Sequence, residues 1–311
     1  MLLYLVFQLA RLLLPLLPER LTYALATGAG DLAYLLYAPG RRVVRDNLRH
    51  VLGPNVSPGR LRRTTREVFR TTARNYVNLF LLPQVDLDTL DRQVLWQGLP
   101  YFEEALARGQ GMVLAGAHLG SFDILSQLAA HRGTPLAVLV EPLRQPQLFR
   151  LVAGLRSSLG LRMLPTTPAG IKTAIKLLRA GGVVGILCDR DIQHRGLRLD
   201  FFGEEASLPT GAVELALRTG AALVPCFGLR LGFRRYAICF EPPLDLPEGE
   251  GLERDPALVR THVVRLAQII ESYVRKYPGQ WVVFERIWPD ATPQQRARSR
   301  LNIKVSSRRG P

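Results

Sequence analysis

The residues best suited to general acid–base chemistry lie in the stretch GAHLGSFD, which contains His118, Gly120 and Asp123. This stretch follows an apolar run and precedes a helical pattern. Two residues five positions apart on one helix point about 140° apart, so His118 is expected on the loop before the helix. Gly120 can fold that loop back toward Asp123, whose carboxylate would then bond to the imidazole and orient it as a general base. The spacing alone leaves a second interpretation open, a structural histidine beside an ordinary first-turn aspartate.

Two other side chains, Ser121 and Cys188, are nucleophile types, and neither is favoured in that role. Ser121 is placed to cap the following helix, with Asp123 in the first turn, and no G-x-S-x-G elbow surrounds it. Cys188 ends the apolar run VVGILC and is expected to be buried and inert. The sequence therefore favours a base rather than a covalent nucleophile.

Two rival functions remain open. The first is a metal-dependent phosphohydrolase, since carboxylates and histidine suit a hard metal ion. Its ligands would be His118, Asp123, Asp189 and Asp191. The second is a basic nucleic-acid-binding protein, in keeping with 41 Lys plus Arg against 26 Asp plus Glu, a net charge of +15. Because the arginines are not interleaved with aromatic residues and no nucleic-acid-binding motif appears, an anionic membrane surface is the favoured polyanionic partner.

The pattern from about residue 110 onward is typical of an α/β protein. Short apolar runs predict strands buried on both faces, at residues 112–117, 136–140, 183–188, 222–231 and 236–240. Helical stretches lie between or after them, at residues 124–131, 147–159, 169–180, 212–219 and 257–277. This alternation predicts a mostly parallel central sheet flanked by helices.

The chain divides into three regions. Residues 1–90 read as a helical N-terminal region, with helices predicted at residues 23–37, 41–52 and 61–82. The α/β domain is predicted at residues 91–290, and residues 291–311 are basic and mostly polar, as expected of a flexible tail. Three cysteines without a close pair argue against a disulfide framework and favour a reducing, cytosolic compartment.

Residues 1–17 are apolar apart from Gln8 and Arg11. As a helix they would be about 25 Å long, shorter than a hydrocarbon core of roughly 30 Å. Three interpretations are open: a signal peptide cleaved after Ala24-Leu25-Ala26, a buried core helix, and a helix that docks on the membrane without crossing it. The docking helix is preferred, because no basic residue precedes the apolar stretch as in a signal peptide.

Five blocks in order carry a resemblance to a known family. They are RRVVRDNL at residues 41–48, HLGSFD at 118–123, EPL at 141–143 with Arg156 ahead of Gly160, DRD at 189–191 with Gly196, DFFG at 200–203 and Pro209, and YPGQW at 277–281. Together they resemble the bacterial lipid A biosynthesis acyltransferase family, which includes lauroyl and myristoyl transferases and phosphatidylinositol mannoside acyltransferases. His118-x4-Asp123 matches the H-x4-D/E motif of such acyltransferases, and Asp rather than Glu at position 123 is closer to the mannoside enzymes.

The resemblance implies an O-acyltransferase at the cytoplasmic face of the inner membrane, peripheral or monotopic. It implies direct transfer of a fatty-acyl group from acyl-CoA or acyl carrier protein to a hydroxyl of a glycolipid or phospholipid, with no other cofactor and no acyl-enzyme. His118 would deprotonate the acceptor, and a thiolate leaves readily from a thioester. Membrane lipids, the lipid acceptor and acyl carrier protein are the expected partners, and nucleic acid is not.

Further site residues follow from the same resemblance. A catalytic role is expected for Glu141, Arg156 and Asp191 beside His118 and Asp123, and a substrate-binding role for Gly120, Ser121, Asp189, Arg190, Phe201 and Phe202. Glu141 and Asp191 come just after predicted strands, at the rim where open α/β sheets bind ligands. Backbone N–H groups around Gly120 are candidate oxyanion donors. The two phenylalanines would line an acyl channel or, alternatively, plug the core.

Overall fold

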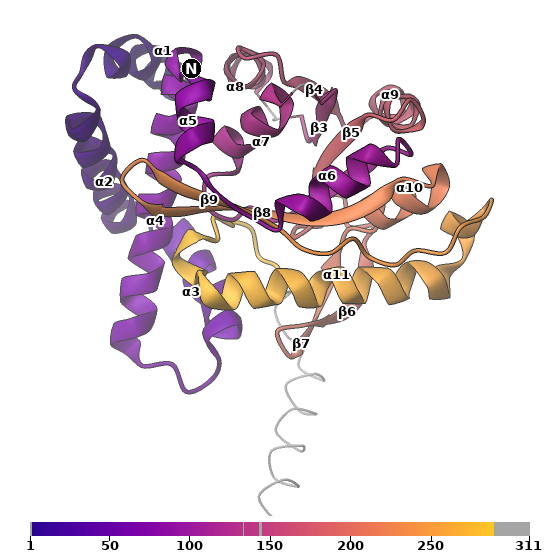
Figure 1. The fold of residues 1–311 in the computed structure, drawn as a ribbon. Helices are drawn as coiled ribbons and strands as arrows, with labels where there is room; N and C mark the ends of the chain where they lie inside the picture. The colour runs from indigo at the N-terminus through magenta and orange to yellow at the C-terminus, as the bar shows by residue number, and fades with distance from the viewer. Residues whose placement is uncertain (1, 133, 143–144, 289–311) are drawn as a thin grey trace, which may run out of the picture.

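The computed structural model describes residues 2–132, 134–142 and 145–288 (Figure 1). In this part of the chain a seven-stranded sheet has the order β1-β9-β8-β2-β5-β3-β4. Its strands are β1 (Leu95–Gln97), β2 (Met112–Gly116), β3 (Leu136–Val140), β4 (Arg162–Pro165), β5 (Val183–Leu187), β8 (Ala222–Gly232) and β9 (Arg235–Phe240). From β8 to β4 all neighbours are parallel, whereas β9 is antiparallel to β8. The predicted α/β class with a mostly parallel sheet is confirmed.

Helices cover both faces of this sheet. They are α5 (Leu87–Gln93), α6 (Leu99–Ala107), α7 (Phe122–His131), α8 (Pro146–Arg156), α9 (Pro168–Arg179), α10 (Gly211–Thr219) and α11 (Pro256–Lys276). Along β2, Met112 and Leu114 face the core under α5 to α8, while Val113 and Ala115 face the core under α9 to α11. Burial on both faces explains why the central strands read as continuous apolar runs.

The N-terminal region is built from helices that pack beside the sheet. It contains α1 (Leu2–Leu13), α2 (Glu19–Leu36), α3 (Ala38–Leu52) and α4 (Pro58–Leu81), with short 3₁₀ turns η1 (Leu14–Leu16) and η2 (Leu82–Gln84). At Gly30 a Cβ would lie 2.7 Å from the Cα of Arg70, so glycine allows α2 to approach α4 closely. Asp31 of α2 pairs with both Arg66 and Arg70, which neutralises part of the arginine-rich α4.

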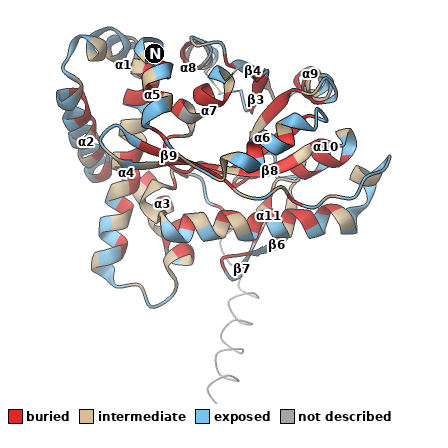
Figure 2. Ribbon diagram, viewed as in Figure 1, coloured by how far each residue is buried: buried red, intermediate tan, exposed pale blue. Residues whose placement is uncertain are grey.

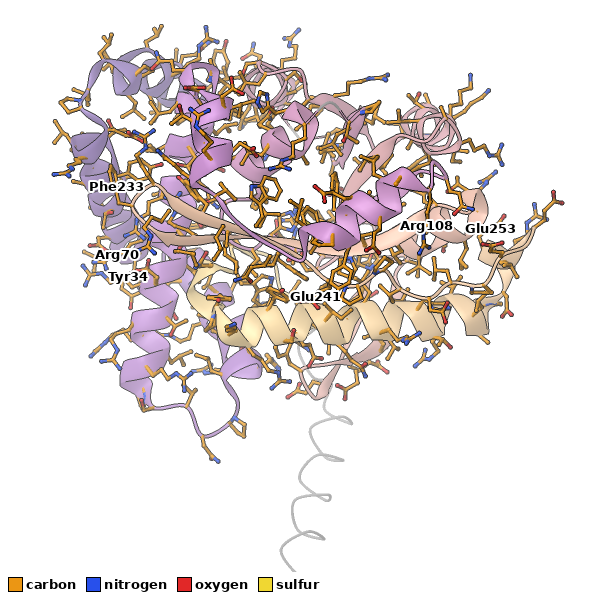
Figure 3. All side chains as sticks on the ribbon, in the orientation of Figure 1. Tyr34, Arg70, Arg108, Phe233, Glu241 and Glu253 are labelled. Atoms are coloured by element: carbon orange, nitrogen blue, oxygen red, sulfur yellow. The ribbon has the colours of Figure 1, made fainter. Side chains whose placement is uncertain are left out.

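Two features join this region to the sheet. The β8–β9 hairpin carries Phe233 to α2 (Figure 3). There its ring meets Tyr23 edge to face at 5.3 Å. A second, two-stranded hairpin of β6 (Leu197–Phe201) and β7 (Glu204–Leu208) packs with α11. The sequence patterns did not predict this hairpin. The expected tail at residues 291–311 lies outside the described residues, and the proposed division into domains stays a prediction.

The outer sides of α1 and α2 contain many exposed residues (Figure 2), and many of these are leucines. The exposed apolar side chains include Leu5, Val6, Leu9, Leu12, Leu13 and Leu16, followed by Leu21, Leu25, Leu32, Leu35 and Leu36. Among the described helices, none has the length and apolar character needed to cross a membrane. The exposed leucines lie along the surface of the N-terminal helices.

Candidate active site

The candidate site lies at the carboxyl ends of the parallel strands. His118 follows β2, Glu141 follows β3 and Asp189 follows β5, so one rim of the sheet carries all three, as expected. The β2–β5 ladder pairs Gly116 with Leu187, and the same register continued by two residues sets His118 opposite Asp189.

Asp189 holds the imidazole of His118. Its Oδ1 lies 2.7 Å from Nδ1 of the ring, and its Oδ2 accepts the backbone N–H of His118 at 2.9 Å. The indole Nε1–H of Trp281 donates to the same Oδ2 at 2.8 Å. An ionised carboxylate only accepts hydrogen bonds, so Nδ1 carries the proton and Nε2 is left as the basic nitrogen.

Burial and charge act in opposite directions on Asp189, whose side chain is 0% exposed. Burial disfavours its charged form, yet His118, its hydrogen bonds and Arg190 hold the pKa of Asp189 below its usual value. The His118 side chain is 18% exposed, so this pair combines a buried anion with a base that solvent reaches. Such an arrangement is suited to general base catalysis.

The predicted hydrogen bond between His118 and Asp123 is not formed, so this prediction is wrong. Asp123 instead forms an ion pair with Arg156, whose Nε lies 2.7 Å from Oδ1 and whose NH2 group donates to Oδ2 at 3.2 Å. Asp123 is in the first turn of α7 and Arg156 is the last residue of α8, so each charge also complements its own helix dipole. The two expected site residues are therefore adjacent, and they tie α7 to α8.

The backbone donors expected around Gly120 are already engaged. The N–H of Gly120 donates to the carbonyl of Gln280 at 2.9 Å, and that of Ser121 donates to the carbonyl of Gly228 at 3.1 Å. Leu119 N–H donates to the Ala117 carbonyl. These three groups are not available to an oxyanion in this conformation, which corrects the expectation.

Gly120 shapes the loop that carries His118. Its φ is +63°, and a Cβ there would lie 2.0 Å from the carbonyl oxygen of Gly228. Only glycine fits this combination of left-handed backbone and close approach. Ser121 takes the N-cap position of α7, but its hydroxyl accepts from Asn78 at 3.4 Å rather than from the helix backbone. The expected side-chain cap is therefore absent at Ser121.

The YPGQW block holds the His118 loop in place through hydrogen bonds, a role that was not predicted from the sequence. Val282 N–H donates to the carbonyl of His118 at 2.8 Å, next to the Gln280 and Trp281 bonds described above. The amide of Gln280 bonds in turn to the backbone N and O of Arg230, both at 2.9 Å. Asn75 of α4 adds a bond from its side chain to the carbonyl of Gly120 at 2.6 Å. The only signal in the sequence was the signature itself.

Arg190 and Glu141 lie on the same side of the site. Arg190 donates to Glu285 at 2.7 Å, and partial burial raises the pKa of Glu141 despite the opposing effect of Arg190. The backbone of Glu285 is held by Asn47, the asparagine of the RRVVRDNL block, which is 2.8 Å from its carbonyl oxygen. The block far upstream thus positions an acidic partner for Arg190.

Asp191, also expected as catalytic, organises its own loop. Its Oδ2 accepts from the hydroxyl of Ser207 at 2.6 Å and from the N–H of Gly196 at 2.8 Å, and Oδ1 accepts from the N–H of Arg195. Although burial opposes ionisation, these hydrogen bonds hold the pKa of Asp191 below its usual value. Its contacts anchor the β6–β7 hairpin, and a catalytic role stays a prediction.

Phe201 and Phe202 are buried in an aromatic cluster with Trp281 and Trp288. Phe202 has a φ of +59°, which is rare for a bulky residue, and it forms the β6–β7 turn together with Gly203. The carboxylate of Glu271 accepts its backbone N–H at 2.7 Å. An acyl channel along these rings stays a prediction, and it would require them to move.

The four residues proposed as metal ligands do not form one cluster, although two of them, His118 and Asp189, are bonded to each other. Asp123 is paired with Arg156 and Asp191 with its own loop, and no group of three or more His, Cys, Asp or Glu in the described chain could hold a metal ion. Cys188 is buried, and this burial raises the pKa of its thiol, as expected for an unreactive cysteine. The geometry therefore favours a reaction that depends on the imidazole of His118 over one that depends on a metal ion or on the thiol of Cys188.

Comparison with known proteins defines the class of this chain. A model of the family described as bacterial lipid A biosynthesis acyltransferase matches residues 1–289. The chain belongs to this family of lipid and glycolipid acyltransferases, which confirms the resemblance.

Among its relatives is the phosphatidylinositol mannoside acyltransferase of Mycobacterium tuberculosis, 31% identical over 289 residues that cover 89% of this chain and 85% of the relative. The enzyme of the same name from Mycolicibacterium smegmatis is 30% identical and covers 87% of each chain. A lipid A biosynthesis acyltransferase from Haemophilus influenzae is 27% identical over 60% of this chain and 56% of its own. The crystal structure of the 1-acyl-sn-glycerophosphate acyltransferase of Thermotoga maritima aligns over 85% of this chain and 99% of its own, with 13% identity and a TM-score of 0.38.

Proposed function

We propose that this protein transfers a fatty-acyl group from a thioester donor, acyl-CoA or acyl carrier protein, to a hydroxyl of a glycolipid at a membrane surface, with His118 as the general base. The observation that carries the proposal is the buried Asp189 carboxylate bonded to Nδ1 of His118. It fixes the tautomer in which Nε2 accepts a proton.

The transfer proceeds in two bond changes. Nε2 of His118 takes the hydroxyl proton as the acceptor oxygen attacks the thioester carbonyl and forms the new C–O bond. The tetrahedral intermediate then expels the thiolate by breaking the C–S bond, and the proton passes from the imidazolium to the thiolate. Asp189 stabilises the imidazolium throughout, because a carboxylate 2.7 Å from the ring favours its charged form.

The Asp123–Arg156 pair has a positioning role in this proposal. It joins the first turn of α7, which follows the His118 loop, to the last turn of α8. A shift of α7 would move the loop that presents the base, and misplacement by about 1 Å can cost roughly 10²-fold in rate.

The membrane step is assigned to the exposed leucines of α1 and α2. Leu12 and Leu16 are 62% and 78% exposed. Large exposed apolar patches typically mark membrane or partner contacts, and a helix of 12 residues is about 18 Å long, which suits lying in the interface. A bilayer is the favoured partner because the acceptors named for the relatives are lipids.

The acceptor is proposed to be a glycolipid of the phosphatidylinositol mannoside type. Two relatives that cover 89% and 87% of the chain, at 31% and 30% identity, carry that substrate in their names. The aspartate at position 123 supports the same acceptor, because Asp rather than Glu at this position resembles the mannoside acyltransferases.

The test is acyl transfer by the purified protein with radiolabelled acyl-CoA or acyl carrier protein, each offered with phosphatidylinositol mannosides or lipid A precursors in mixed micelles. Wild type should acylate a glycolipid, and His118→Ala should lose at least about 10²-fold in rate while remaining folded. His131→Ala is the matched control, since His131 is exposed and pairs with Asp88 instead. Chelator should leave the rate unchanged. Full transfer by His118→Ala, or loss of activity on chelation, contradicts the proposal.

A further inference from the structure

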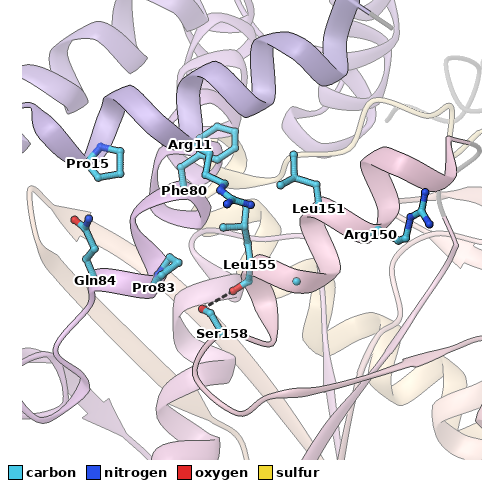
Figure 4. A pocket seen from close by; sticks show the side chains of 10 residues that line it. Arg11, Pro15, Phe80, Pro83, Gln84, Arg150, Leu151, Leu155 and Ser158 are labelled. Atoms are coloured by element: carbon cyan, nitrogen blue, oxygen red, sulfur yellow. Dashed lines mark hydrogen bonds between the residues drawn. The ribbon is translucent and has the colours of Figure 1, made fainter.

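A groove between α1 and α8 contains two arginines that the transfer chemistry does not use. Two adjoining cavities of about 430 and 330 Å³ open there, and both are lined by Arg11, Arg150 and Leu151. Figure 4 shows the larger one, in which Arg11 extends from α1 toward α8.

The groove has polar walls and an apolar floor. Tyr4, Gln8 and Arg11 lie at i, i+4 and i+7, so they form one stripe along α1. Opposite them, Gln147 and Arg150 come from α8. The apolar part of the lining is made of Pro15, Phe80, Pro83, Leu151 and Leu155. A ligand that fits this lining has a charged or polar head beside an apolar portion.

The two arginines lack counter-ions. In the described chain neither Arg11 nor Arg150 has an ion-pair or hydrogen-bond partner, whereas Arg66 and Arg70 share Asp31. The residues that line the two cavities include no Asp or Glu. Both guanidinium groups line the groove without an acidic neighbour, so an anion bound there is attracted by each of them. Guanidinium groups bind phosphate oxygens bidentately, so phosphate is the anion this pair fits best.

We propose that this groove binds the phosphate of an anionic phospholipid from the bilayer on which the protein docks. The choice of a bilayer lipid comes from the neighbouring stripe of α1, where Leu5, Leu9 and Leu12 are exposed. With that stripe in the interface, the long side chain of Arg11 can extend from the apolar layer to headgroup level. The inference rests on the proposed membrane docking, and it adds a lipid preference to it.

The first experiment measures flotation of the full-length protein with vesicles of phosphatidylcholine alone or with added phosphatidylglycerol. Wild type should bind both and favour the anionic vesicles. Arg11→Gln/Arg150→Gln should bind neutral vesicles as wild type does and lose roughly thirtyfold of the binding to anionic vesicles, since each arginine near an anionic surface contributes about 1 kcal/mol.

Arg62→Gln/Arg63→Gln is the matched control, because it removes the same charge from exposed sites on α4. Those sites lie about 25 Å along the helix from Phe80, at 1.5 Å per residue. Equal losses of binding to anionic vesicles in both double variants would mean that net charge alone drives binding. This result would overturn the proposed phosphate site in the groove. Absence of wild-type binding to any vesicle would overturn the docking step and the groove with it, while acyl transfer to micellar acceptor would still report on His118 independently.

A second experiment tests the source of the phosphate without a bilayer. Calorimetric titration with soluble dihexanoyl phosphatidylglycerol should give binding that is lost in Arg11→Gln/Arg150→Gln and retained in the control pair. Dihexanoyl phosphatidylcholine should bind more weakly. If free coenzyme A binds at these arginines and the short-chain lipid does not, the groove belongs to the acyl donor and the proposal is wrong.

Discussion

His118 and Asp189 face each other where the β2–β5 ladder would continue by two residues beyond Gly116 and Leu187. The N–H of Cys188 still donates to the carbonyl of Gly116 at 2.8 Å, so sheet-like pairing extends to the residue before Asp189. Beyond it the side chain of Asp189 replaces the backbone and accepts both the N–H and the ring Nδ1 of His118. The imidazole of His118, the proposed base, is therefore positioned by the central sheet itself.

Replacing the carboxylates of Asp189 and Asp123 with amides, one at a time, should distinguish the orienting role of Asp189 from the positioning role of Asp123. Asp189→Asn is expected to lower kcat by about 10²- to 10⁴-fold, because an amide can stabilise the wrong tautomer and cannot stabilise the imidazolium. Asp123→Asn should cost less, and Asp123→Asn/Arg156→Gln should be no worse than the more impaired single variant, since the two side chains form one pair. The measurement is steady-state transfer with glycolipid acceptor. A larger loss in Asp123→Asn than in Asp189→Asn would return the orienting role to Asp123.

The lowered pKa of Asp189 makes its contribution to stability depend on pH. Its folded pKa lies below the unfolded value of about 3.9, so the contribution is complete above that pH and declines as pH falls toward the folded value. Asp189→Asn should lower the free energy of unfolding on the order of 1–3 kcal/mol at pH 7. Urea unfolding of both proteins should show this difference shrinking between pH 4 and pH 3, within the range set by the unfolded pKa of about 3.9. A difference that grows on acidification would contradict the sign of the shift.

Gly120→Ala should damage the site more than a comparable change elsewhere. The new Cβ would lie 2.0 Å from the Gly228 carbonyl oxygen at a φ of +63°, so the His118 loop must move. We expect a loss of stability above about 1 kcal/mol and of activity above about tenfold. Gly53→Ala is the control, because Gly53 also has a positive φ, +82°, but a Cβ there meets nothing within 4 Å. Thermal unfolding and transfer rates, compared across the two variants, isolate the effect of the close approach.

Polar substitution of the exposed leucines should weaken membrane binding without unfolding the protein. Burying one leucine contributes about 1.5–3 kcal/mol, so Leu9→Asn and Leu12→Asn should each reduce partitioning into neutral vesicles by roughly tenfold or more. Leu95→Asn is the control, since Leu95 is 50% exposed on edge strand β1. Equal behaviour of all three variants in vesicle flotation would count against docking through α1.

The strands were predictable because a parallel sheet covered on both faces leaves continuous apolar runs, and β2, β3 and β5 begin where expected. The β6–β7 hairpin was missed because its turn contains Phe202, which is not a usual residue for a positive φ. Local spacing offered Asp123 as the partner of His118, whereas the actual partner is 71 residues away. That pairing depends on β2 and β5 being neighbours, and sequence patterns do not fix strand order.

The remaining contacts of the site could not be predicted from the sequence, for a similar reason. YPGQW was recognisable as a signature, but its action depends on the carbonyl of Gln280 and the indole of Trp281 meeting a loop that precedes them by some 160 residues. Likewise, Asn47 acts through the backbone of Glu285. Most of these contacts involve a backbone atom, which leaves no trace in residue type, and the bond from Trp281 to Asp189 joins side chains 92 residues apart.

The contact of Trp281 with Asp189 also sets an order of assembly. During synthesis on the ribosome, β2, β5 and their helices can pair before the indole has emerged, and the imidazole then lacks the last of its supports. The chain must therefore be made as far as Trp281 before all the bonds to the Asp189 carboxylate can form. A nascent chain stalled ahead of Pro278 would therefore lack the indole that donates to Asp189, and we expect it to have little capacity for acyl transfer.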